Sequence, residues 1–132
     1  MGNLASRRPG WMLSLWLLAA TGAAAEDAVS FKRDVLPVLN KHCVMCHMVG
    51  TELGNFSLYP DPLGNMLGMQ STQSELNLVE AGKPETSYLL VKMLDQQAAM
   101  GGKGLRMPWE YTIDAAQIEP IRRWILQGAK DN

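Results

Sequence analysis

The stretch Cys43-Val44-Met45-Cys46-His47 has the pattern C-x-x-C-H, and this motif decides how the rest of the chain is interpreted. Two cysteines separated by two residues lie on one turn of backbone, so both thiols can add to the two vinyl groups of one porphyrin and form thioether bonds. The residue that follows, His47, can then supply an axial nitrogen to the iron. The motif therefore predicts one covalently attached haem c, held by Cys43, Cys46 and His47.

The same cysteine pair could instead form a redox-active dithiol or half of a zinc site. A thioredoxin-like dithiol requires a βαβ context, and no such pattern surrounds Cys43 and Cys46. A structural zinc ion requires four ligands, and the chain contains only two cysteines and two histidines. The second histidine, His42, directly precedes Cys43 and is poorly placed to complete a tetrahedron. Haem attachment is therefore the preferred interpretation.

The first 25 residues have the layout of a secretory signal peptide. Arg7 and Arg8 form a basic segment, residues 11–20 form an apolar run, and three alanines at 23–25 provide a cleavage site of the A-x-A type. An uncleaved membrane anchor is the less favoured alternative, because a spanning helix needs about 20 apolar residues. A twin-arginine signal is matched only weakly. The leader therefore predicts export, to the periplasm or another exported space.

We expect cleavage after Ala25, which leaves residues 26–132 as one domain without a membrane span. The whole chain has a formal net charge of −1, and the cleaved chain becomes more acidic because Arg7 and Arg8 are removed. A nucleic-acid partner is not expected, since no basic stripe is present. No disulfide is expected either, because the haem consumes both cysteines.

Apolar periodicity and capping residues predict helices over residues 30–42, 83–98 and 114–128. The last is the best defined, because Asp114 and Gln117 have the spacing of a capping box and a glycine ends the pattern. No internal repeat and no strand of convincing period is present. The predicted fold is therefore all-α, with about three to four helices around one covalently attached haem.

Two prolines interrupt these helical patterns. If Asp34 is the N-cap of the first helix, Pro37 falls in its first turn, where the missing N–H costs little. If Ser30 is the cap, Pro37 is interior and should kink the helix. Pro120 removes one hydrogen bond from the last helix and should bend its first turns.

Residues 50–71 are rich in glycine, proline and asparagine and are predicted to form a loop beside the haem motif. Metal-bound histidines usually donate their second N–H to an orienting acceptor. We therefore expect a carbonyl of this loop to accept a hydrogen bond from His47, with Pro60 and Pro62 as candidates.

Besides the haem motif at 43–47, four further segments match a known family, and together they extend over nearly all of the predicted domain: residues 31–39, 82–90, 106–108 and 121–129. In these segments the chain resembles single-haem c-type cytochromes, and among them the planctomycete-type cytochrome c domains. The resemblance implies a cytochrome c fold whose first and last helices pack across each other. It also implies His47 and Met107 as axial ligands. Lys83 and Pro120 depart from the family pattern, but neither touches these ligands.

The residues themselves leave several candidates for the sixth ligand, with lysine as a remote option: Met66, Met69, Met93, Met100 and Met107. His42 is excluded because it is adjacent to Cys43. Met107 is favoured because Pro108 restricts its backbone, whereas Met100 has three glycines nearby. Arg106 could in addition meet a haem propionate.

These features predict a periplasmic electron-transfer protein that carries one electron and serves an unidentified dehydrogenase, reductase or oxidase. No acid–base constellation suggests an enzyme. Two alternatives remain open: a haem enzyme or gas sensor with an open sixth position, and a docking subunit whose haem is incidental. Exposure of the reduced protein to carbon monoxide discriminates the first alternative from the carrier.

Overall fold

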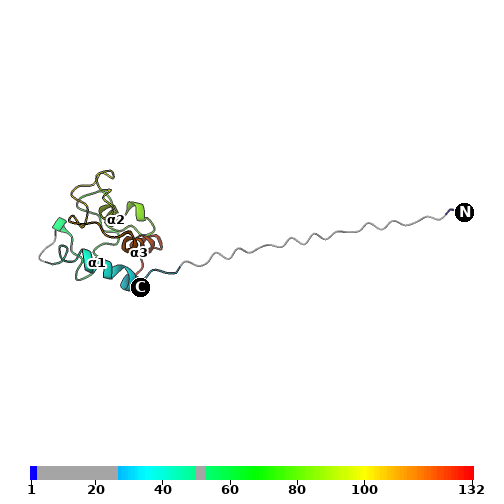
Figure 1. Ribbon diagram of the computed structural model, residues 1–132, viewed down its shortest axis with the longest axis horizontal. Coiled ribbons are helices and arrows are strands. Elements are labelled where there is room, and N and C mark those ends of the chain that lie inside the picture. Colours follow the sequence, from blue (N-terminus) through cyan, green and yellow to red (C-terminus); the bar gives the residue numbers. More distant parts are fainter. Residues whose placement is uncertain (3–26, 50–52) are drawn as a thin grey trace.

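The computed structural model describes residues 1–2, 27–49 and 53–132. Within these residues it contains three α-helices and three short helical turns, without a β-strand (Figure 1). The all-α prediction is therefore confirmed for the described part of the chain. Residues 3–25 of the predicted signal peptide, its cleavage site included, lie outside the described residues. Among the helices that are described, none has the length and apolar character needed to cross a bilayer.

The first helical segment leads directly into the cysteine motif. It begins with a π-helical turn, η1 (Phe31–Val35), and continues as α1 (Leu36–His42). Ser30 is the N-cap, because its hydroxyl accepts a hydrogen bond from the Arg33 N–H at 3.2 Å. Pro37 is therefore interior to the helical segment. The wider π-turn before it is a local means of accommodating a proline ring and its missing N–H.

The second helix is shorter than the sequence pattern predicts. A 3₁₀ turn, η3 (Pro84–Thr86), precedes α2 (Tyr88–Met93), which ends five residues before the expected end at Ala98. Asp95 adopts a left-handed conformation with a φ of 59° just after the helix, and aspartate tolerates this conformation better than most residues. The helix is also buried on nearly every side instead of along one stripe.

The last helix, α3 (Ala115–Leu126), matches its prediction closely. The Asp114 carboxylate caps it by accepting a hydrogen bond from the Ala116 N–H at 2.9 Å. Gly128 follows the helix with a φ of 102°, a conformation that favours glycine. The capping box is only half formed, since the Gln117 side chain pairs with His42 instead.

Replacing Asp114 by alanine is expected to lower the free energy of unfolding by about 1 kcal/mol, the usual cost of losing an N-cap. Denaturant unfolding of Asp114→Ala measures this directly. Glu110→Ala is the matched control, since it removes an exposed carboxylate outside the helix. Equal stabilities of the two variants would contradict the capping role.

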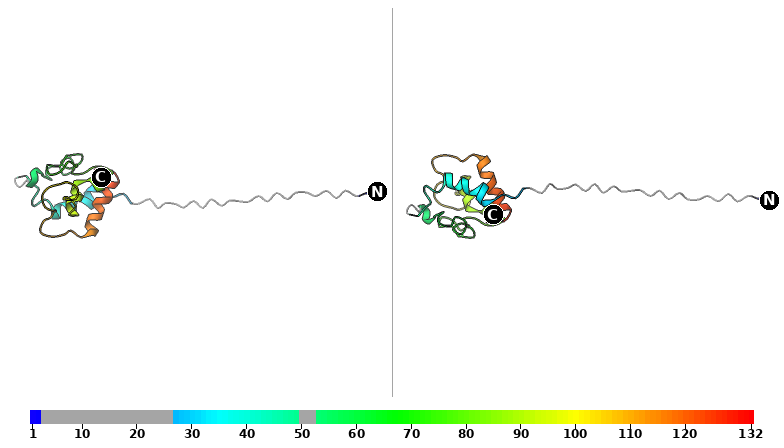
Figure 2. Two further views of the ribbon diagram at one scale, coloured as in Figure 1. Left: turned by 90° about the horizontal axis from the view of Figure 1, so that it is seen from above. Right: turned by 90° about the horizontal axis from the view of Figure 1, so that it is seen from below.

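The start of the first helical segment packs against α3 (Figure 2). The rings of Phe31 and Trp124 lie 5.1 Å apart between centroids, and both side chains are buried. The indole N–H of Trp124 donates to the Lys130 carbonyl at 2.9 Å, so this buried polar group is satisfied. The contact joins the first helical segment to the last helix, and α1 continues from there to the cysteine motif.

Candidate functional site

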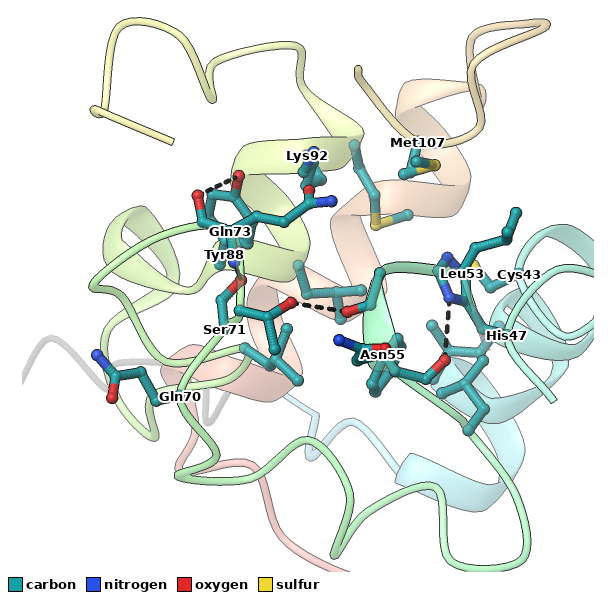
Figure 3. A pocket seen from close by; sticks show the side chains of 18 residues that line it. Cys43, His47, Leu53, Asn55, Gln70, Ser71, Gln73, Tyr88, Lys92 and Met107 are labelled. Carbon is teal, nitrogen blue, oxygen red and sulfur yellow. Dashed lines mark hydrogen bonds between the residues drawn. The ribbon is translucent and has the colours of Figure 1, made fainter. Parts of the chain in front are cut away.

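A pocket of about 230 Å³ lies between the cysteine motif, the segment after it, α2 and the segment before α3 (Figure 3). Cys43, His47 and Met107 all line it, so the fold brings together three of the four predicted site residues. Cys46 is not among the lining residues, and its side chain is exposed. Most of the pocket wall is apolar: Leu39, Leu53, Phe56, Leu58, Leu78, Leu89 and Met93.

The cysteine motif forms a tight turn that continues from α1. The Cys43 N–H donates to the Leu39 carbonyl at 2.9 Å, and the His47 N–H donates to the Cys43 carbonyl at 3.0 Å. The two cysteines and the histidine therefore share one backbone turn, as the spacing predicted.

His47 is oriented by the loop that follows the motif. Its Nδ1 lies 3.2 Å from the Phe56 carbonyl oxygen, which can only accept, so Nδ1 carries the proton (Figure 3). Nε2 is then the basic nitrogen that can bind a metal. The expected loop carbonyl is thus present, but the expectation that Pro60 or Pro62 supplies it is wrong. Burial lowers the pKa of His47, which favours the neutral imidazole that a metal requires.

The thiol of Cys43 does not have the properties of a catalytic dithiol. Burial raises its pKa to about 12. Reactive C-x-x-C cysteines have lowered pKa values, because the thiolate is the nucleophile. Cys43 is partly exposed, and the raised pKa of its thiol gives no support to the dithiol alternative.

The zinc alternative requires further ligands beside the cysteine motif. Within residues 1–2, 27–49 and 53–132, no three side chains of histidine, cysteine, aspartate or glutamate gather closely enough to hold an ion. His42 is committed elsewhere, since its ring nitrogens lie 2.9 Å from the Tyr111 hydroxyl and 3.2 Å from the Gln117 side chain. The described residues therefore do not supply a tetrahedral zinc site.

The five methionine candidates for the sixth ligand differ in burial and in whether they line the pocket. Met66 is fully buried in the core, and Met69 and Met100 are exposed and do not line the pocket. Only Met93 and Met107 line it. Met93 is a core side chain of α2 and is only 4% exposed.

Lys92 is a pocket residue that the sequence analysis missed. It is only 7% exposed, and burial lowers its pKa. Its position among the apolar residues of α2, four residues after Tyr88, was the available signal, because residues four apart share a helix face. Its backbone carbonyl accepts a hydrogen bond from the Met107 N–H at 3.0 Å.

The pocket end away from Cys43 and His47 carries neutral polar side chains. Figure 3 shows Ser71 and Gln73 there, and Asn55 and Thr72 also line the pocket. Hydroxyl and amide groups of this kind can donate hydrogen bonds to carboxylates. Arg106, the predicted propionate partner, is not a lining residue and donates to Thr112 at 2.6 Å instead.

The pocket residues are of the kinds that hold a c-type haem: Cys43, an oriented histidine, a methionine and an apolar wall with one polar end. The second cysteine, Cys46, lies on the same backbone turn as Cys43 but outside the pocket lining.

A comparison of the chain with protein-family models, with curated protein sequences and with solved structures found no match.

Proposed function

We propose that this chain is an exported single-haem c-type cytochrome of the cytochrome c fold, and that it carries one electron between redox proteins. One observation supports the proposal most strongly: the C-x-x-C-H turn places Cys43 and His47 in the same apolar pocket as Met107. Both cysteines would form thioethers, and His47 and Met107 would be the axial ligands. When bound, the haem supplies an iron that cycles between Fe(II) and Fe(III).

The remaining pocket residues would set the properties of that iron. The Phe56 carbonyl holds the imidazole of His47 in one tautomer and orientation. The apolar wall excludes water, and burial together with a thioether ligand favours the ferrous state and raises the reduction potential. The neutral hydroxyl and amide groups near Gln73 are suited to donate hydrogen bonds to the haem propionates.

A filled sixth position favours an electron carrier over an enzyme, because a coordinatively saturated iron has no place for a substrate. The partner would be a dehydrogenase, reductase or oxidase in the same exported space. The runner-up function, a haem enzyme or gas sensor, requires that the sixth position stays open.

Carbon monoxide distinguishes the two functions. The ferrous protein is expected to bind carbon monoxide slowly and incompletely, because Met107 must first leave the iron. The Soret band measured before and after addition reports binding. Rapid and complete binding with a shifted Soret band would contradict the carrier function and favour the sensor or enzyme.

A further inference from the structure

The segment between α2 and α3 carries Met107 but has little apolar anchoring. None of residues 98–112 is buried in the described structure, and they form no regular helix. The large apolar side chains of this segment point outward: Met100, Leu105, Trp109 and Tyr111 are all more than 40% exposed. Hydrophobic burial therefore does not explain how Met107 is kept at the pocket.

Hydrogen bonds hold this segment instead, and Lys92 makes three of them. The Lys103 N–H also donates to the Gln73 carbonyl at 2.9 Å. The Lys92 ammonium donates to the Lys103 carbonyl at 2.6 Å and to the Leu105 carbonyl at 2.8 Å. The Lys92 backbone carbonyl accepts from the Met107 N–H at 3.0 Å. Lys92 thus makes hydrogen bonds with every second residue of this stretch: Lys103, Leu105 and Met107. Met107 is the proposed ligand.

Neighbouring groups stabilise the Lys92 ammonium in this position. Its ammonium lies 5.4 Å from the centre of the Tyr88 ring, and the Tyr88 hydroxyl donates to the same Lys103 carbonyl at 3.0 Å. Gly104 passes so close that a Cβ atom there would lie 2.9 Å from the ammonium nitrogen. A buried ammonium needs such partners, and hydrogen bonds from a charged donor are about twice as strong as neutral ones.

We propose that Lys92 is a positioning residue for Met107: its ammonium ties down the segment that presents the methionine to the pocket. The inference rests on the proposed function, since it takes Met107 as the sixth ligand of a haem. Lys92 itself is not a ligand in this arrangement, because its amine is committed to two carbonyls.

The test is Lys92→Leu in the haem-bearing protein, with Lys103→Leu as the matched control. Leucine adds no sulfur to the pocket wall, so it cannot replace Met107 at the iron. Both substitutions remove one positive charge, but the Lys103 side chain is exposed and only its backbone takes part in the contact. Losing two charge-assisted hydrogen bonds is expected to shift the equilibrium between the bound and detached methionine by roughly 10- to 100-fold. Lys92→Leu should therefore lose much of the weak ferric absorption band of the iron–sulfur(methionine) bond and bind carbon monoxide faster. Lys103→Leu should keep the band and the carbon monoxide binding rate of the parent protein.

A merely structural role would lower thermal stability without changing the band or carbon monoxide binding well below the unfolding temperature, and that result would overturn the inference. If Lys92→Leu does not fold, Lys92→Gln replaces it, because its shorter amide can reach at most one carbonyl and should give a smaller shift. Failure of both variants to fold would assign Lys92 to the folding core and also overturn the positioning role. A parent protein without haem or without the band would refute the proposed function instead.

Discussion

Replacing both cysteines, Cys43→Ala together with Cys46→Ala, is expected to yield an exported chain without covalent haem and with little remaining stability. The pocket wall is mostly apolar, and without the attached group it is exposed to water. At about 25 cal/mol per Å² of apolar surface, this exposure costs on the order of a few kcal/mol. Small domains have total stabilities of about 5–15 kcal/mol, so this loss is a large part of the whole.

Circular dichroism and denaturant unfolding of the purified double variant measure this effect. Val44→Ala with Met45→Ala is the matched control, because it changes the two residues between the cysteines and leaves both thiols and His47 in place. The control should keep covalent haem and most of its stability. A double cysteine variant that unfolds at the parent's denaturant concentration would show that the fold does not depend on the attached group.

Replacing Met107 by leucine is expected to remove the sixth ligand while keeping the apolar bulk of the side chain. The weak ferric absorption band of iron–methionine bonding should vanish, and ferrous iron should bind carbon monoxide rapidly. The reduction potential should fall by a substantial part of the roughly 0.8 V range that axial ligation spans in haem proteins. Absorption spectroscopy and potentiometric titration of the haem-bearing variant measure these changes.

Met93→Leu is the sharpest control for this assignment, because Met93 is the other methionine that lines the pocket. It should keep the band and the potential of the parent protein. The opposite pattern, with the band lost in Met93→Leu and kept in Met107→Leu, would make Met93 the ligand. Met100→Leu extends the series to a methionine that is exposed and away from the pocket.

Features determined by local backbone chemistry were predictable from the sequence. Asp114 caps α3 and Gly128 ends it, because a capping carboxylate and a left-handed glycine act within one helical turn. The turn that joins Cys43 to His47 is likewise a consequence of spacing alone. The choice between Ser30 and Asp34 as the first cap was open, because both positions offer a side-chain oxygen and only the packed structure selects one.

Contacts between distant segments were not predictable in the same way. The partner of His47 is the Phe56 carbonyl, and which carbonyl of a loop faces a ring depends on the path of the whole loop. Lys92 is bound to residues 11 and 13 positions further along the chain, through backbone carbonyls that have no side-chain signature. The early end of α2 has the same origin, since tertiary packing overrides a helical pattern that continues past Met93.

The intact mass of the protein, produced with export and haem attachment, tests the central proposal most directly. We expect the mass of the chain from Glu26 to Asn132 plus one haem, with the haem resistant to extraction by acidified acetone. A mass equal to the polypeptide alone, or a haem that acidified acetone removes, would contradict covalent attachment through Cys43 and Cys46.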